Sequence, residues 1–262
     1  MLIGFLGGDG RMEIAAAFLK DHGHEVRTHL SAHLAALPSL DLLVLPYPAT
    51  RDGVTVAGTA LPFSSLPLPP ALPLFGGRLP PSWREGRASG DAEENEAFLV
   101  ENARLTAAAG VGVALRATER AFFRTDAAVV GFGRIGKASA AYLRALGAAV
   151  TVYVRREAAA ADAEAQGFHA QLLAGVRAFP EALVFGTVPA PAPALAALCV
   201  KEGALVYDLG GGLPASMPTE ACGSVPVCAL RGAPGVFAPK AAGELYGGAV
   251  LSFLGTLKAP NP

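Results

Sequence analysis

Short apolar runs alternate with a segment of helical periodicity along the first part of the chain. The predicted strands are Leu2–Leu6, Glu25–Leu30 and Leu40–Leu45, and Met12–Asp21 is a predicted helix. Continuous apolar strands separated by helices are typical of a parallel sheet that is covered on both faces. We therefore expect an α/β arrangement in this part of the chain.

The alternation resumes in the second half. The predicted elements there are strands at Thr125–Gly133, Ala149–Val154, Ala182–Phe185, Ala204–Asp208 and Val225–Ala229, and helices at Lys137–Leu146 and Lys240–Leu257. The first two of these strands and the helix between them make one βαβ unit. A second parallel sheet is therefore expected.

Two segments lie between the halves. Leu61–Trp83 is rich in proline and admits short strands such as Leu72–Phe75, so we expect a surface cover or the lining of a cleft. Ser89-Gly90-Asp91 precedes a helical pattern that runs to about Arg116, and Asp91 or Ser89 can cap it. A helix of this length in mid-chain is expected to bridge two domains.

These patterns predict an α/β chain of two doubly wound parallel-sheet domains joined by long bridging helices. Residues 1–92 form the first domain, which we expect to bind substrate or a partner, and residues 93–118 form the bridging helix. Residues 119–237 form the second domain, and residues 238–262 form a helix that returns toward the first.

Composition narrows the class of protein. Of 262 residues, 52% are hydrophobic and 16% are charged, which suffices for a core and excludes a disordered chain. The net charge of −1 gives no basic field for nucleic acid. Prolines interrupt the charge-free stretches, and Asp9 follows an N-terminus without basic residues, so neither a membrane span nor a signal peptide is predicted. The cysteines lack metal-ligand spacing, which indicates a reducing, cytoplasmic setting and no metal site.

A glycine-rich loop carries the most specific signal. Gly131-Phe132-Gly133-Arg134-Ile135-Gly136 follows an apolar strand and opens a helix, which is the context of a dinucleotide-binding loop. Gly131 makes the turn, Gly133 lets the backbone approach a pyrophosphate, and Gly136 permits close packing of helix on strand. Arg134 and Ile135 begin the helix, whose free amides attract the anion. The sequence therefore predicts a Rossmann NAD(P)-binding domain.

The end of the next strand selects between the two nicotinamide cofactors. An NAD site has an acidic residue there, whereas this chain has Arg155 and Arg156. Guanidinium groups pair with a 2′-phosphate, so NADP is predicted in preference to NAD.

Two later strand ends face the nicotinamide half of such a site. Thr187-Val188-Pro189 is expected to contact the nicotinamide ribose, and Asp208, Gly210 and the glycines after it are expected to let a ligand approach the backbone. Ordinary loop chemistry explains both segments equally well. No histidine follows His169, so a histidine–carboxylate acid/base pair in or after this domain is not predicted.

The N-terminal Gly7-Gly8-Asp9-Gly10-Arg11 resembles a degenerate glycine loop without the helix-packing glycine, so we predict an anion site there rather than a second dinucleotide site. This loop and other segments together resemble the A-subunit family of dipicolinate synthase over nearly the whole chain. The remaining shared segments are Leu45-Pro46, Glu101-Asn102-Ala103, the loop at 131–136, Thr187-Val188-Pro189, Asp208-Leu209, Ala233-Pro234-Gly235 and Ala238-Pro239-Lys240-Ala241-Ala242-Gly243. The chain departs from the family at Gly186, where asparagine is usual, and in the apolar turn Leu209–Gly212.

The resemblance implies an NADP-dependent oxidoreductase that oxidises dihydrodipicolinate or hydroxytetrahydrodipicolinate to dipicolinate in spore formation. It implies a partner, the flavoprotein-like B subunit of dipicolinate synthase. A homo-oligomer of this chain is also compatible with the resemblance. Alternatives are another NADP-dependent dehydrogenase of shikimate or hydroxyacid type, or a non-catalytic protein that binds a dinucleotide and positions a partner enzyme.

The substrate implied by the resemblance is a small dicarboxylate, and several residues can hold it. Candidate cations are Arg11, Arg51, Arg78 and Lys240, and candidate polar partners are Asp9, Glu101 and Asn102. Lys240 follows Pro239 in the first turn of the last helix, where a cation opposes the helix dipole. We therefore predict that Arg11 and Lys240 bind the two carboxylates with Asp9 nearby, and that Lys240, Asn102 and Glu101 serve the reaction.

Overall fold

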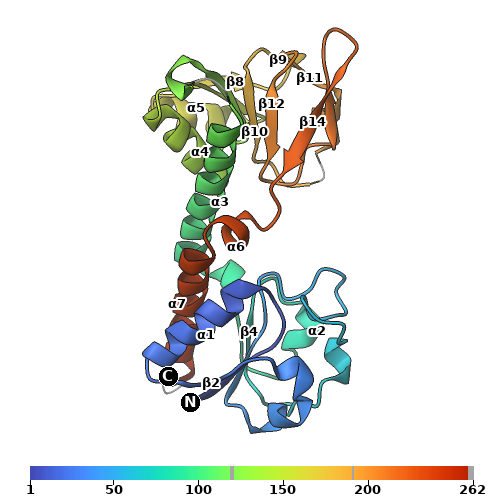
Figure 1. Cartoon of the computed structure of the whole chain (residues 1–262), viewed down its shortest axis with the longest axis vertical. Coiled ribbons are helices and arrows are strands. Elements are labelled where there is room, and N and C mark those ends of the chain that lie inside the picture. Colours follow the sequence, from blue (N-terminus) through green and yellow to red (C-terminus); the bar gives the residue numbers. More distant parts are fainter. Residues whose placement is uncertain (119–120, 191, 259–262) are drawn as a thin grey trace. The chain divides into compact units, whose positions relative to one another are not determined.

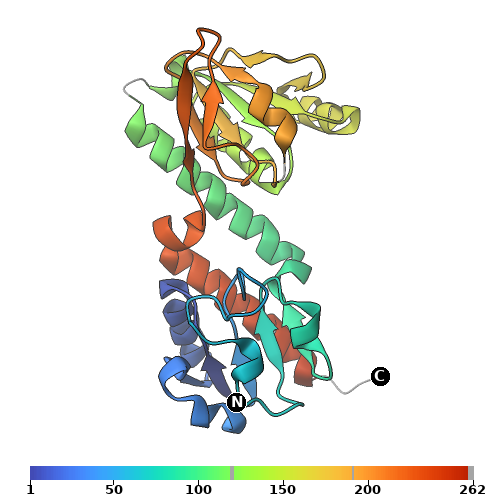
Figure 2. The same ribbon diagram turned by 90° about the vertical axis from the view of Figure 1, so that its right-hand side faces the viewer.

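The computed structural model describes residues 1–118, 121–190 and 192–258. Contacts divide the chain into unit 1, Met1–Asn102 with Pro234–Pro262, and unit 2, Ala103–Ala233. Both units are α/β with mostly parallel sheets, which confirms the predicted fold class (Figure 1). The bridging helix predicted at 93–118 corresponds to α3, Glu96–Ala117, which contributes residues to both units. Figure 2 shows α3 as one uninterrupted helix.

Unit 1 contains a five-stranded sheet in the order β2-β1-β3-β4-β5 with every neighbouring pair parallel. Its strands are β1 Leu2–Phe5, β2 Glu25–Arg27, β3 Leu42–Val44, β4 Leu74–Gly76 and β5 Ser89–Asp91. Its helices are α1 Gly10–Asp21, α2 Pro81–Arg84, α6 Ala233–Phe237, which starts at the unit boundary, α7 Pro239–Lys258 and the start of α3.

The sheet of unit 1 buries side chains on both faces. On one face, strand residues such as Phe5 pack with α1, α7 and Phe98 of α3. Gly243 and Gly247 of α7 let that helix approach α1, because a Cβ at either position would come within 2.6 Å of Ile14 or Phe18. The alternate strand residues pack on the other face in a second core.

The proline-rich segment Leu61–Trp83 differs from its prediction as a surface cover. It supplies much of this second core, where Phe63 stacks on Trp83 with ring centroids 4.2 Å apart. Proline excludes a long helix but not burial, because the segment satisfies its backbone through short turns and β4. The segment therefore alternates buried side chains, such as Leu66 and Leu72, with exposed prolines, such as Pro67 and Pro70.

The start of α3 also differs from the prediction. Ser89–Asp91 is the edge strand β5, which pairs with β4. Asp91 nevertheless acts as a cap, because its carboxylate accepts the N–H of Glu93 in the 3-10 turn Ala92–Glu94. The long helix α3 begins only at Glu96, so Asp91 ends a strand and caps a short turn instead of α3 itself.

Unit 2 contains a seven-stranded sheet in the order β13-β14-β12-β10-β6-β7-β8, with only the edge pair β13–β14 antiparallel. Its strands are β6 Asp126–Val130, β7 Ala149–Val154, β8 His169–Leu172, β10 Leu183–Gly186, β12 Leu205–Asp208, β13 Ser216–Pro218 and β14 Ser224–Ala229; β9 Ala178–Phe179 and β11 Cys199–Val200 pair separately. Its helices are α4 Arg134–Ala145, α5 Glu157–Ala165 and the larger part of α3.

The sheet of unit 2 is also covered on both faces. Val111 and Ala114 of α3 pack on one face with Ala140 and Leu143 of α4. The short β9–β11 ribbon contributes Phe179 and Val200 to the core on the other face. The topological switch lies at β6, from which the chain proceeds outward first through β7 and β8 and then through β10 and β12.

Among the described residues, α3 alone is long and apolar enough, by length and composition, to cross a membrane. This is weak evidence for a span, because the core helix of a globular domain passes the same test. Phe98, Val111 and Ala114 of α3 lie in the two apolar cores.

Candidate functional site

The glycine loop of unit 2 joins β6 to α4 at the switch point of the sheet. Gly131 has φ of +98°, a left-handed conformation that ends β6 three residues before the predicted boundary. A Cβ at Gly136 would lie 2.2 Å from the carbonyl oxygen of Gly131, so the first turn of α4 packs directly on the loop. Both glycines therefore serve the local backbone, as the sequence predicts.

Gly133 has a different reason to lack a side chain. A Cβ there would meet no atom within 4 Å. Gly133 is the N-cap of α4 and has no side chain with which to cap it. The open space beside this helix N-terminus suits an anion that approaches the backbone.

A pocket of about 430 Å³ adjoins this helix N-terminus. Its lining residues are Phe132, Gly133, Arg134, Lys137, Arg156, Ala158, Ala159 and Asp162. The pocket therefore joins the glycine loop to the start of α5, which follows β7. This is where a dinucleotide-binding fold holds the adenosine ribose.

Arginine side chains surround this end of the sheet. Arg155 and Arg156 directly follow β7 and are exposed, and Arg156 is the N-cap residue of α5. Lys137, which the sequence analysis did not single out, pairs with Asp162 at 2.7 Å, and its hydrogen bond lowers the pKa of that carboxyl. The structure brings Arg134 and Arg156 to one pocket, as expected for a phosphate site.

The loop after β10 packs against the glycine loop. The Thr187 hydroxyl donates to the carbonyl oxygens of Val130, at 2.9 Å, and Gly131, at 3.1 Å. Thr187 is half-buried, and Pro189 is exposed and bridges to Gly211. Thr187 thus holds the glycine loop in place through the chain's own backbone.

The glycines after β12 also have an internal role. A Cβ at Gly210 would lie 2.3 Å from the carbonyl oxygen of Val188. The loop after β10 therefore fills the space that the sequence analysis reserved for a ligand. Of the two explanations left open for this segment, packing between loops accounts for the glycine.

Asp208 ends β12 and its side chain is only 1% exposed. One of its oxygens accepts the Gly211 N–H at 2.7 Å, and the other lies 3.8 Å from Nη2 of Arg231. Arg231 was not predicted from the sequence, because it lies in a loop after β14 with no motif around it. Its charge compensates the buried carboxylate.

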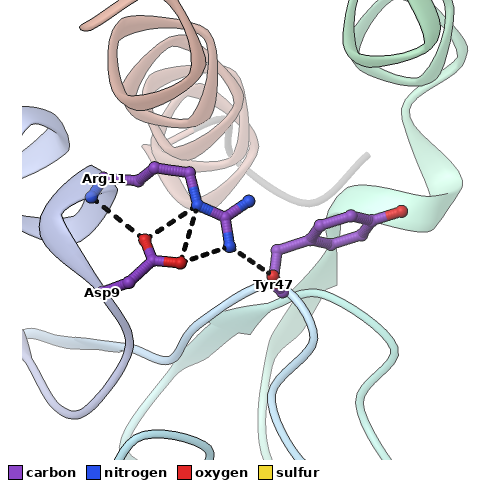
Figure 3. A network of polar contacts seen from close by, with 3 residues as sticks. All are labelled: Asp9, Arg11 and Tyr47. Atoms are coloured by element: carbon purple, nitrogen blue, oxygen red, sulfur yellow. Dashed lines mark hydrogen bonds and ion pairs between the residues drawn. The ribbon is translucent and has the colours of Figure 1, made fainter. Parts of the chain in front are cut away.

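A second polar cluster occupies the carboxyl edge of the sheet in unit 1, where Figure 3 shows Asp9, Arg11 and Tyr47. Arg11 donates through Nε and Nη2 to both oxygens of Asp9 at 2.8 Å, and Nη2 also donates to the carbonyl oxygen of Tyr47 at 3.1 Å. The Arg11 side chain is 15% exposed. Burial alone would raise the pKa of Asp9, but Arg11 and the charge of Arg51 lower it.

The N-terminal glycine loop is closed by the protein itself. Gly8 donates its N–H to the carbonyl oxygen of Ala57, and a Cβ at Gly58 would lie 2.5 Å from the backbone of Gly8. Asp9 caps α1 by accepting the N–H of Arg11, so a carboxylate already occupies the helix N-terminus. The loop is thus held by contacts within the chain, and the Asp9 carboxylate lies at the helix N-terminus for which an anion site is predicted.

The other predicted site residues of unit 1 are dispersed. Lys240 is 84% exposed, and its Nζ lies 4.0 Å from Oε1 of Glu244, one turn further along α7. Glu101 is exposed and Asn102 is half-buried on α3. The contacts of the described residues place Asp9 with Arg11 but do not place Lys240 with either of them.

Several polar residues at the carboxyl edge of this sheet were not predicted from the sequence. Tyr47 donates its hydroxyl to Oε1 of Glu93 at 2.6 Å, a pairing across 46 residues. Burial and this hydrogen bond raise the pKa of the Tyr47 phenol. No local motif announces such a pair, because the two residues meet only when β3 and β5 enter one sheet.

No group of three or more histidine, cysteine, aspartate or glutamate side chains that could hold a metal is found among the described residues. The cysteines Cys199, Cys222 and Cys228 are free thiols.

Together these features define a two-unit α/β chain in which unit 2 has a Rossmann-type sheet and glycine loop. No protein-family model matches the sequence, and no curated protein matches it. The fold is similar to that of the A subunit of dipicolinate synthase from Bacillus halodurans, with a TM-score of 0.72 and 19% identity over 99% of this chain and 98% of that chain.

Two further solved structures share the fold. The A chain of dipicolinate synthase from Bacillus subtilis has a TM-score of 0.76 and 19% identity over 98% of this chain and 97% of that chain. A transhydrogenase from Sinorhizobium meliloti has a TM-score of 0.63 and 18% identity over 98% and 93% of the two chains. At these identities the similarity establishes the fold.

Proposed function

We propose that the chain is an NADP-dependent oxidoreductase that corresponds to the A subunit of dipicolinate synthase. Its reaction is the oxidation of dihydrodipicolinate, or of hydroxytetrahydrodipicolinate with loss of water, to dipicolinate for spore formation. The observation that supports the proposal most is the pocket at the N-terminus of α4, where Gly133 is open and Arg134 and Arg156 converge. The similarity of fold to two A subunits of dipicolinate synthase supports the choice of substrate.

The residues of unit 2 fit a nicotinamide dinucleotide. The N-terminus of α4 and the open face of Gly133 suit a pyrophosphate, and Arg134 and Ile135 begin that helix. Arg155 and Arg156 would bind the 2′-phosphate through charge-assisted hydrogen bonds. When bound, the cofactor supplies an acceptor for the hydride that leaves the substrate.

The loops after β10 and β12 would border the nicotinamide half. Thr187 fixes the glycine loop, and Val188 and Pro189 continue the same edge. Asp208 and Gly210 hold the neighbouring loop through the chain's own hydrogen bonds and packing. These residues therefore act by shaping the site.

The residues of unit 1 would bind the substrate. Arg11, oriented by Asp9, and Lys240 are proposed to bind carboxylates, since both side chains are hydrogen-bond donors that pair with anions. Glu101 is proposed to take up the proton that leaves the ring, and Asn102 and Lys240 are proposed to orient the reacting groups by hydrogen bonds. Aromatisation of the product supplies much of the driving force, which reduces the need for a strong base.

A flavoprotein-like B subunit is proposed to be the partner, on the strength of the similarity to the A subunits of dipicolinate synthase. Among the described residues, exposed Val236 and Phe237 at the end of α6 are apolar side chains available to a partner.

A spectrophotometric assay tests the proposal. The purified chain, with and without the B subunit, is given NADP and the product of the dihydrodipicolinate synthase reaction, and reduction of NADP is followed together with formation of dipicolinate. Turnover supports the proposal. Tight NADP binding without turnover under either condition would instead indicate a non-catalytic dinucleotide-binding protein, and turnover only with a hydroxyacid or shikimate would indicate another dehydrogenase.

A further inference from the structure

Arg78 follows Gly77, the first residue after β4, and has an unusual backbone conformation. Its φ is +55°, in the left-handed region that residues with side chains seldom adopt. The Asp91 carboxylate holds this conformation by accepting the N–H groups of Arg78 at 2.9 Å and Leu79 at 2.7 Å. Asp91 is only 8% exposed, so these hydrogen bonds form away from solvent. The sheet edge therefore fixes the backbone of Arg78 from the neighbouring strand β5.

The guanidinium of Arg78 is fixed as well. Its Nε donates to Oε1 of Glu93 at 2.7 Å, and the same oxygen accepts the Tyr47 hydroxyl at 2.6 Å. The guanidinium carbon lies 5.8 Å from the centroid of the Tyr47 ring, which packs edge-on against Phe98. Glu93 engages Nε, and the Tyr47 side chain is a second hydrogen-bond partner of the guanidinium. A guanidinium has five N–H groups, so these two partners leave donors for a further ligand. The Arg78 side chain is nonetheless 68% exposed.

Stability does not explain this arrangement. A left-handed position favours glycine or asparagine, so arginine costs stability there. An exposed ion pair such as Arg78–Glu93 returns little of that cost. Strained residues held by surrounding hydrogen bonds are characteristic of ligand clamps.

The location also suits a ligand. Arg78 follows β4, Tyr47 follows β3 and Arg11 follows β1, so all three lie at the carboxyl edge of one parallel sheet. Ligands of open α/β sheets bind outside this edge. A planar fork of two N–H groups on a fixed guanidinium matches a carboxylate.

We propose that Arg78 is a further carboxylate-binding residue of unit 1, beside Arg11 and Lys240, with Tyr47, Glu93 and Asp91 as positioning residues. The two Nη groups bind one carboxylate of a small dicarboxylate. The identity of this anion as the substrate rests on the proposed function, whereas the site itself belongs to unit 1 alone.

Calorimetric titration of the full chain with pyridine-2,6-dicarboxylate tests the proposal. The informative variant is Arg78→Gly, which tolerates the left-handed backbone and removes only the side chain. We expect an unchanged or higher Tm and an increase in Kd of about tenfold or more, the loss of charge-assisted hydrogen bonds. Arg78→Lys keeps the charge without the fork and is expected to recover only part of the affinity.

Arg84→Gln is the matched control, because Arg84 also pairs with an exposed glutamate of unit 1, Glu94, at 2.7 Å. It should bind the dicarboxylate as the parent does. Parent affinity in Arg78→Gly, no binding by the parent, or equal losses in both variants would overturn the proposal, as would binding of inorganic phosphate at Arg78 in place of the dicarboxylate. NADP affinity is measured on the same samples, so a failure of the proposed cofactor is seen separately from a failure at Arg78.

Discussion

The Thr187 hydroxyl hydrogen bonds to the carbonyl oxygen of Val130 over 2.9 Å and so ties the loop after β10 to the end of β6. The bond lies directly behind the glycine loop, since a Cβ at Gly131 or Gly136 would come within 2.9 Å of this hydroxyl. The conformation of the proposed cofactor loop therefore depends on a residue 56 positions away in the chain.

Replacing Thr187 with valine is expected to loosen the glycine loop. The substitution keeps the shape and leaves two carbonyl oxygens without this donor, at a cost of about 1–3 kcal/mol in unfolding free energy. NADP affinity should fall with it, whereas Thr187→Ser, which keeps the hydroxyl, should remain close to the parent. Chemical denaturation and calorimetric titration with NADP measure both effects. Equal behaviour of the two variants would mean that the hydrogen bond does not hold the loop.

The second and third glycines of the loop, Gly133 and Gly136, should respond differently to replacement with alanine. At Gly133 the added Cβ meets no protein atom, so Gly133→Ala should cost at most about 1 kcal/mol of stability and yet weaken NADP binding by obstructing the pyrophosphate. At Gly136 the Cβ would collide with the Gly131 carbonyl, so Gly136→Ala should cost about 1–3 kcal/mol. Thermal unfolding with and without NADP separates these outcomes. Normal NADP affinity in Gly133→Ala would contradict the placement of the pyrophosphate.

Arg155 and Arg156 should determine the choice between cofactors. Replacing both with glutamine should weaken NADP by about 1.5–3 kcal/mol, or roughly tenfold or more, because charge-assisted bonds to the 2′-phosphate are lost. NAD affinity should stay unchanged. Arg124→Gln, an exposed arginine of unit 2 that stacks on Phe123, serves as control. Equal affinity of the parent for NADP and NAD would show that these arginines do not recognise a phosphate.

Lys240→Met tests the proposed role of the last helix. Lys240 is exposed at the N-terminal end of α7, so its removal should barely change stability. If it binds a substrate carboxylate, KM should rise about tenfold or more while NADP affinity is retained. Lys20→Met, at the end of α1, is the control. If the KM of Lys240→Met equals that of the parent, Lys240 is a surface residue that does not bind substrate.

Asp9 should make unit 1 more stable above about pH 4 than below it. Its pKa in the fold lies below the ordinary value of 3.8, so the ionised form stabilises the fold above that pH, and this contribution is lost as pH falls through the lowered pKa. The deficit of Asp9→Asn in unfolding free energy should therefore be largest near neutral pH and shrink in acid. Asp21→Asn, at the opposite end of α1, is the comparison. A deficit independent of pH would show that Asp9 acts without its charge.

Much of the fold could be predicted from the sequence because burial on both faces makes strands such as β3 and β10 continuously apolar. The glycine loop could also be predicted, because its glycine spacing is local and because Gly131 and Gly136 meet conformational and steric needs within a few residues. Strand β5 was not predictable in the same way, because the polar Ser89–Asp91 is a strand only through its pairing with β4.

The polar cluster of unit 1 was the least predictable part of the candidate site. Its pairs join residues far apart in sequence, as Tyr47 with Glu93 and Arg78 with Asp91. Local propensity carries no information about such partners. The burial of the proline-rich segment was not predicted for a related reason. Its apolar residues have neither helical nor strand periodicity.

One hydrogen bond has a consequence for biosynthesis. Tyr246 of α7, buried in unit 1, donates its hydroxyl to the carbonyl oxygen of Leu45 at 2.6 Å, across 201 residues. Val250 and Leu254 of the same helix complete a core that Ile3 and Phe5 begin. The strands of unit 1 leave the ribosome before α7 and must wait for it, whereas unit 2 is contiguous and is translated in full before α7. We expect unit 2 to finish folding before unit 1 during synthesis. Until α7 is made, the strands of unit 1 expose an apolar face to chaperones.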